Sequence, residues 1–297
     1  SFSMPSIETL NRRSRTAGDL RSLVRTMKAL AAVSIRQYER AVESLADYNR
    51  TVEMGFQILM REKETSLLKE RGTKKCLGAV VFGSDLGMCG QFNEQIAAYA
   101  LEEMKKLGCE PSDRSCVVVG ARVTGYLEDG NQKVDKELSV PGSMSGITLT
   151  VQEINEILSD WWMSKKINQL YLFYNNHISG SQYRPHSVRL LPLDLEWLQD
   201  IKMRKWPTKV LPMYTLEWQK LFPLIVRQYV FVSLFQATAE SLASENASRL
   251  AAMQGAEKNI DDVLSGLKLQ FHQERQMAIT DELLDIVAGF EALAEPE

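Results

Sequence analysis

The chain has 297 residues, of which 44% are hydrophobic and 25% are charged, as in a folded globular protein. Its formal net charge of −3 gives no global basic surface of the kind that binds nucleic acid. No stretch reaches the roughly 18 to 20 consecutive apolar residues of a membrane span, since Pro223 and Arg227 interrupt the longest candidate. The four cysteines lack CxxC spacing and the three histidines stand apart, so we expect reduced core cysteines, a cytosolic compartment, and no metal or cofactor.

The first segment, residues 4–72, is predicted to form one long helix. No proline lies between Pro5 and Pro111, and Gly18-Asp19 offers a helix start. From there, apolar residues recur in alternating steps of three and four, which is typical of a coiled-coil seam: Leu20, Leu23, Val24, Met27, Leu30, Ala31, Ile35, Tyr38, Val42 and Leu45. The run continues to about Leu68, a rod of about 75 Å, which is too long for a compact domain.

Strand and helix signals alternate in the middle segment, residues 73–212. Short apolar runs predict strands at 76–82, 116–119, 167–174 and 187–193. Residues 92–107 follow a helical period that Gly108 ends, and a second helix is expected at 151–163, capped by Thr150. Continuous apolar strands separated by helices indicate a Rossmann-like α/β domain with a mostly parallel sheet.

The last segment, residues 213–297, is predicted to be helical from about Trp218 to Leu293, with Gly255 and Gly266 inside the helix. Two long terminal helices pair most simply as an antiparallel coiled coil with the α/β domain inserted between them. Charge favours this pairing: residues 12–50 hold nine basic and four acidic side chains, and residues 240–297 hold four basic and twelve acidic ones.

One loop lies where phosphate-binding loops occur, between the first strand and its helix. However, residues 83–90 match neither GxGxxG nor GxxxxGK[ST], and no lysine follows Gly90. Cys89 in this loop has no neighbouring base that could activate it as a nucleophile. Catalysis by the chain itself is therefore disfavoured, although a nucleotide-dependent enzyme and a coiled-coil scaffold or regulatory protein remain alternatives.

Four separated stretches match the motifs of one known family. Residues 242–253 (LASENASRLAAM) resemble LASExxARMxAM, and residues 275–289 resemble RQxxITxELxEIVxG. Residues 84–93 (SDLGMCGQFN) are similar to SDRGLCGGFN, and Thr26-Met27-Lys28-Ala29 aligns with AMKM. Through these stretches the chain resembles the gamma subunit of the rotary F-type ATP synthase, and departures at Leu86, Met88 and Gln91 mark a divergent branch of the family.

The resemblance implies a non-catalytic rotor at the central stalk. Such a subunit couples ion translocation through the membrane sector to ATP synthesis or hydrolysis, by rotating inside a hexamer whose catalytic sites lie on beta. The implied partners are the alpha and beta subunits, the epsilon subunit and the membrane c-ring. The implied location is peripheral, on the cytoplasmic face of the inner membrane.

The resemblance also implies which residues contact the beta subunit. Arg275 and Gln276 align with the family pair that meets the beta catch loop, where a guanidinium suits bidentate contact with an acidic residue. Thr280 and Glu282 belong to the same motif. Met27 aligns with a position near the acidic lever segment of beta, and Phe290 and Leu293 are expected to lie in an apolar sleeve of the hexamer.

Overall fold

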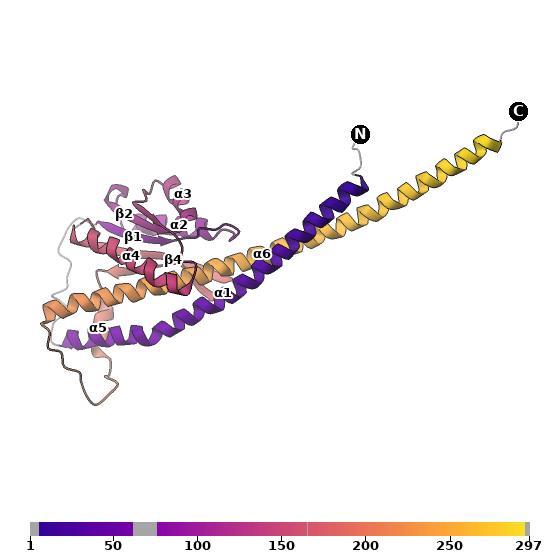
Figure 1. Ribbon diagram of the computed structural model, residues 1–297. Helices are drawn as coiled ribbons and strands as arrows, with labels where there is room; N and C mark the ends of the chain where they lie inside the picture. The colour runs from indigo at the N-terminus through magenta and orange to yellow at the C-terminus, as the bar shows by residue number, and fades with distance from the viewer. Residues whose placement is uncertain (1–5, 62–75, 165, 295–297) are drawn as a thin grey trace. The chain divides into compact units, whose positions relative to one another are not determined.

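The computed structural model describes residues 6–61, 76–164 and 166–294, with side chains described as far as Phe290. In chain order the elements are α1 (Ile7–Arg61), β1 (Leu77–Phe82), α2 (Phe92–Lys106), η2 (Pro111–Asp113), β2 (Arg114–Val119), α3 (Ala121–Asp129), β3 (Lys136–Leu138), α4 (Met144–Met163), β4 (Gln169–Ser179), β5 (Gln182–Leu191), α5 (Leu195–Met203) and α6 (Trp218–Ala294). Figure 1 labels most of them.

The chain divides into two compact units. The first, called here the helical unit, consists of residues 1–30 and 251–297. The second, called here the α/β unit, consists of residues 31–250 and contains every strand.

The α/β unit is built on one five-stranded sheet with the order β3-β2-β1-β4-β5. The pairs β3–β2, β2–β1 and β1–β4 are parallel, and β5 is antiparallel to β4. The central strand β1 is buried along its whole length, as expected for a parallel strand covered on both faces. The predicted architecture of long terminal helices and a mostly parallel sheet is confirmed.

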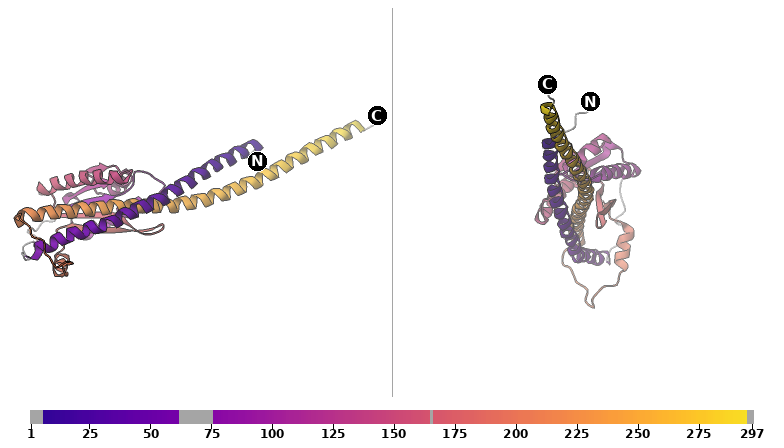
Figure 2. Two further views of the ribbon diagram at one scale, coloured as in Figure 1. Left: turned by 60° about the horizontal axis from the view of Figure 1, so that its bottom comes forward. Right: turned by 90° about the vertical axis from the view of Figure 1, so that its right-hand side faces the viewer.

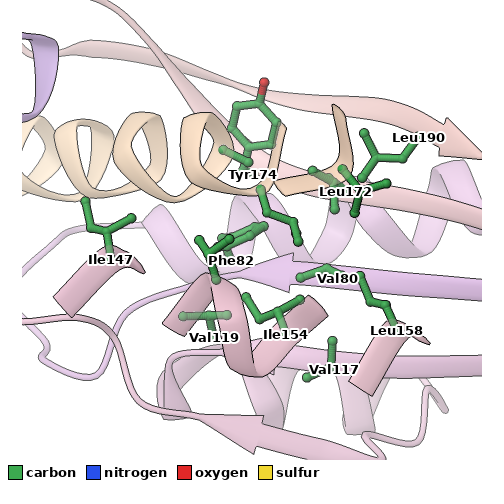
Figure 3. Packing of buried hydrophobic residues seen from close by; sticks show 14 of the residues in the cluster. Val80, Phe82, Val117, Val119, Ile147, Ile154, Leu158, Leu172, Tyr174 and Leu190 are labelled. Carbon is green, nitrogen blue, oxygen red and sulfur yellow. The ribbon is translucent and has the colours of Figure 1, made fainter. Parts of the chain in front are cut away.

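One face of the sheet packs against α4 and α6. Figure 3 shows Val80 and Phe82 of β1 and Val117 and Val119 of β2 beside Ile154 of α4. From α6, apolar side chains including Val230, Leu234 and Ala237 join the same cluster. The small residues Ala239, Ala243 and Ala247 are at most 1% exposed, so this helix lies close against its neighbours.

The opposite face is covered by α2 and α3 (Figure 1). The hydrophobic core on this face contains the alternate residues of β1, such as Ala79 and Val81. It also contains Ile96, Ala100 and Met104 of α2. A third cluster joins the C-terminal part of α1 to α5 and the first turns of α6, with Phe56 at its centre and fully buried. The ring of Phe56 meets Trp197, Phe222 and Tyr229 edge-on.

In the helical unit, α1 and α6 pair through a seam that is apolar and charged in turn. Three buried residues of α1 recur at intervals of seven: Leu10, Ala17 and Val24. A partly buried polar residue follows each of them four positions later: Ser14, Arg21 and Lys28. From α6 the seam receives buried Met253 and Leu267. The two helices pair as predicted, but the residues that form the seam differ from the predicted ones.

The prediction that three leucines lie in the buried seam is wrong. Leu20, Leu23 and Leu30 are 49%, 56% and 63% exposed. A step of seven between buried positions leaves one apolar residue per heptad facing the partner helix. Leu20 lies at the edge of the seam, in a groove that it lines with Val263 and Leu267 of α6. Leu23 and Leu30 add to the exposed apolar surface of α1.

Several predicted boundaries also need correction. Helix α1 begins at Ile7, where Ser6 Oγ accepts a hydrogen bond from the Thr9 amide, so Gly18 lies inside the helix. Helix α4 begins at Met144, because Ser143 caps it through the Gly146 amide, and Thr150 is not its cap. The predicted end of α1 near Leu68 lies outside the described residues. The sequence also gave no sign of α3, β3 and α5.

Over part of its length α6 has the length and composition of a membrane-spanning helix, contrary to the expectation from the sequence. Val230, Leu234 and Ala237 of α6 pack in the core of the α/β unit. Only 28% of the apolar window is buried, however, so core packing accounts for only part of its apolar composition.

Candidate functional site

The five residues expected to contact a partner lie in the helical unit, but they form two groups. Arg275, Gln276, Thr280 and Glu282 lie within two turns of α6. Met27 lies on α1 between Arg25 and Lys28, which both pair with Glu257. Residues 257 and 275 are separated by about 27 Å of helix at about 1.5 Å per residue. The structure therefore does not bring Met27 to the other four residues.

The four residues on α6 point in more than one direction. Gln276 and Thr280, one turn apart, line a shallow groove together with Leu10 of α1 and Met277. Thr280 Oγ1 donates a 2.9 Å hydrogen bond to the Gln276 carbonyl oxygen, so its hydroxyl is already in use within the helix. Arg275 and Glu282 do not line this groove.

From Arg275 to Phe290, every residue of α6 is exposed, and this stretch is called here the free end. In Figure 2 the helix continues past the N-terminal end of α1. The exposed side chains include large apolar ones: Met277, Ile279, Leu283, Leu284, Ile286, Val287 and Phe290, the last 70% exposed. The side chain of Leu293 lies outside the described residues. Large apolar side chains left exposed along a helix are typical of a surface that a partner covers.

Around Met27 the seam is held by ion pairs whose individual partners could not be predicted from the sequence. Glu257 accepts from both Arg25 Nε, at 2.7 Å, and Lys28 Nζ. One turn further along α6, Asp261 pairs with Arg21 Nε at 2.7 Å. Hydrogen bonds from Lys28 and Arg25 lower the pKa of Glu257 to about 2. The opposite charges of the two terminal helices were the signal for these contacts, and they fix the antiparallel register.

The loop at 83–90 in the α/β unit uses its polar groups to hold itself together. The Asp85 carboxylate accepts from the Ala121 amide at 2.9 Å and from the Val140 amide at 2.8 Å, which ties the loop to the start of α3 and the segment after β3. Asn93 bonds both the amide and the hydroxyl of Ser84, at 2.9 and 2.8 Å. With its donors and acceptors engaged in this way, the loop is a structural turn and not a phosphate cradle.

The same loop is also hydrogen-bonded to α6. Ser248 Oγ donates to the Cys89 carbonyl oxygen at 2.5 Å, and Arg249 Nη2 lies 3.5 Å from the Gly87 carbonyl oxygen. Further back on α6, Ser244 Oγ donates to the Asn175 carbonyl oxygen at 2.8 Å. Two of the motifs quoted above, residues 84–93 and 242–253, therefore meet in space and join α6 to the sheet.

The cysteines and histidines form no cluster with chemistry of its own. Among the described residues, no group of three or more His, Cys, Asp or Glu side chains could hold a metal ion. All four cysteines are free thiols. Cys89 is buried beside Ser84 and Asn93, and burial together with the nearby Asp135 raises the pKa of Cys116 to about 12. Both are therefore core thiols.

The family model and the curated relatives that match this chain point to the same family. The family described as ATP synthase matches residues 6–293. The ATP synthase gamma chain of Syntrophus aciditrophicus is 30% identical over 295 residues, covering 98% of this chain and 100% of the relative. The gamma chain of Trichormus variabilis is 27% identical, again over 98% of this chain and 100% of the relative.

Solved structures agree in fold. A chain in a structure of OSCP, F1 and the c-ring of the Euglena gracilis mitochondrial ATP synthase matches with a TM-score of 0.61 at 14% identity, covering 97% of this chain and 94% of that one. The central stalk of the Tetrahymena thermophila enzyme matches with a TM-score of 0.57 at 19% identity, covering 79% and 99%. The matched length and the order of the motifs place the chain in the family of ATP synthase gamma chains, the non-catalytic central-stalk subunits of rotary F-type ATP synthases.

Proposed function

We propose that this subunit turns inside a hexamer of alpha and beta subunits and that the free end of α6 is the part that the hexamer encloses. The observation that carries this proposal is the exposure of every residue from Arg275 to Phe290. Seven of these residues are large and apolar, and water is a poor solvent for such a helix. An apolar sleeve supplied by the hexamer would remove them from water.

Within this arrangement, Arg275 and Gln276 are the proposed contacts to the beta subunit. Both side chains are exposed, and no described residue forms an ion pair with Arg275. An exposed guanidinium is free to form a bidentate bond with a carboxylate on a partner. Glu282 lies seven residues along the same helix and therefore projects on nearly the same side as Arg275, whereas Thr280 projects with Gln276.

Met27 is proposed as a second, separate contact with the beta subunit, about 27 Å along the coiled coil from Arg275. Its side chain is partly buried and lies next to Lys28, so a partner would reach it at the edge of the charged seam. Two contacts at different heights suit a shaft that transmits torque, because a rod held at one level can tilt.

The other proposed partners are the epsilon subunit and the c-ring of the membrane sector. As an ATP synthase gamma chain, the subunit belongs to a membrane-associated complex, and we assign it to the cytoplasmic face of the inner membrane. Rotation of the shaft would then couple ion movement through the c-ring to ATP synthesis or hydrolysis on beta.

Reconstitution tests this proposal directly. The full chain is mixed with purified alpha and beta subunits, and the ATPase rate of the hexamer is compared with and without it. We expect a stoichiometric complex and a changed turnover rate. A control chain that ends before Arg275 should assemble more weakly, since it lacks the apolar end. An ATPase rate that does not respond to the full chain would refute the rotor assignment.

A further inference from the structure

The α/β unit contains an apolar pocket that plays no part in the function proposed above. It lies among α4, the start of β4, the segment after β5 and the first turns of α6, and its volume is about 470 Å³. This size falls within the roughly 300 to 1,000 Å³ of small-molecule sites in proteins. All but three of its lining residues are apolar, among them Leu158, Trp162, Leu193 and Val226.

The three polar lining residues differ in what remains available to a ligand. Ser159 Oγ already donates to the Asn155 carbonyl oxygen at 2.7 Å. The side-chain amide of Asn155 makes no hydrogen bond to any described residue, although Asn155 is only 9% exposed. Arg227 is exposed and forms no ion pair within the described part of the chain.

Arg227 therefore supplies an unneutralised positive charge to a pocket that is otherwise apolar. A guanidinium forms its strongest hydrogen bonds with carboxylates and phosphates. An apolar pocket with one such group and one free amide fits a molecule with an apolar body and a single anionic head. A neutral hydrocarbon would leave Arg227 and Asn155 unused, and a polar anion such as free phosphate would leave the apolar walls facing water.

We propose that this pocket binds a single-chain fatty acid, with its chain against the apolar walls and its carboxylate held by Arg227. Arg227 lies one residue from Val226 and three from Val230 on α6, so the same helix supplies both apolar wall and charge. No covalent step is involved, and the proposal does not depend on contacts with the hexamer.

The first experiment locates the site with dodecanoate as the probe. The full chain is titrated with dodecanoate below its critical micelle concentration, and binding is followed by calorimetry. We expect one molecule per chain. A brominated dodecanoate should quench tryptophan fluorescence, and Trp162→Phe should remove most of that quenching. Absence of binding, or quenching unchanged in Trp162→Phe, would overturn the proposal.

The second experiment uses a variant that fills the pocket and a matched control. Ser159 is exposed on α4 at the pocket wall, so Ser159→Trp adds bulk without disturbing the core. This change should weaken dodecanoate binding by about tenfold or more, whereas Ser159→Ala, which loses the same hydroxyl, should not. Equal affinities in both variants would contradict a site in this pocket. Circular dichroism melting checks that both variants fold.

The third experiment tests the role of charge. Arg227→Gln should weaken binding of dodecanoate by about tenfold and leave binding of dodecanol unchanged, while Arg227→Lys should keep a preference for the acid. Equal losses for the acid and the alcohol would show that Arg227 does not hold the head group. Binding to anionic lipid vesicles without binding to monomeric dodecanoate would also overturn the assignment, since it would indicate a membrane surface instead of a single-chain ligand.

Discussion

Arg249 Nη2 lies 2.7 Å from Glu245 Oε1, and the two side chains are only 10% and 7% exposed. The pair is one turn apart on α6, beside the loop at 83–90 that Arg249 also contacts. Burial raises the pKa of the Glu245 carboxyl, and the hydrogen bond from Arg249 opposes that rise. The ion pair therefore compensates for a carboxylate that the fold has removed from water.

Replacing Arg249 by Leu should destabilise the α/β unit by about 3 to 5 kcal/mol, because the Glu245 charge would be left buried without a partner. The double change Glu245→Gln with Arg249→Leu should recover much of the loss. Urea unfolding followed by circular dichroism measures both, with exposed Arg36→Ala as a control that shifts stability by less than about 0.5 kcal/mol. A double variant no more stable than the single one would show that packing, and not charge, is decisive.

Gly120 allows the loop after β1 to approach the start of α3. Its φ of +107° is unfavourable for other residues, and a Cβ there would lie 2.6 Å from the Ser84 amide nitrogen. Gly120→Ala should therefore cost about 2 kcal/mol or more. Gly125, inside α3 with no atom within 4 Å of an added Cβ, is the matched control, and Gly125→Ala should gain up to about 1 kcal/mol. Denaturant unfolding compares the two variants, and a loss at Gly125 would contradict the argument.

The helical unit should lose stability in acid through Glu257. Its folded-state pKa of about 2 lies below the ordinary value of 4.5, so the deprotonated form is favoured by folding. The stabilisation is complete above about pH 4.5 and is lost as the pH falls towards 2. When the pH is lowered from 5 to 3, the melting temperature of the wild type should therefore fall more than the melting temperature of Glu257→Gln. Neighbouring Asp262→Asn, exposed and without an ion pair in the described part of the chain, should behave as the wild type does.

Arg275→Ala should slow ATP turnover of the reconstituted complex by about tenfold, because a charge-assisted contact with the beta subunit would be lost. The side chain is exposed, so melting of the isolated chain should not change. Lys268→Ala, another exposed cation on the same helix, is the control and should leave turnover unaffected. Unchanged turnover in Arg275→Ala would remove this residue from the proposed contact.

Met27→Lys should reduce ion pumping per ATP hydrolysed by about half or more while slowing ATPase less, since it adds a charge next to Lys28 at the proposed beta contact. The added ammonium also competes for Glu257, which already accepts from two cations. Met27→Leu keeps the apolar volume and should leave coupling intact. Ion pumping and ATP hydrolysis are measured on the same vesicles, and a parallel fall in both would argue for simple destabilisation of the seam.

Elements with a strong hydrophobic pattern could be predicted from the sequence, and weakly patterned ones could not. In α2 the buried residues Phe92, Ile96, Ala100 and Met104 follow one another at steps of four, and the predicted bounds agree within a residue or two. Strand β3 has only one buried side chain, Leu138, so its sequence carries no hydrophobic pattern that would predict a strand. Its position is determined by pairing with β2.

The sequence motifs suggest which residues form the candidate site, but they do not predict how those residues are arranged in space. Motif similarity names Met27 and Arg275 together, yet their separation depends on the pairing register, which the contacts of Glu257 and Asp261 set. The sequence pattern predicts the wrong start for α1 because Gly18 resembles a helix boundary. A helix interior tolerates glycine at a cost of about 1 kcal/mol, and Ser6 supplies the true cap.

The free end of α6 has a further consequence for the subunit before assembly. Only the start of this stretch lines a groove with a residue of α1, Leu10, and each residue that extends a helix beyond its tertiary contacts gains little stability in water. Newly synthesised subunits should then carry a tail that melts well below the temperature of the remaining fold, and chaperones or proteases would meet it first. Hydrogen exchange should find rapid exchange confined to residues 275–290 in the solitary chain and slow exchange once the hexamer has closed around them.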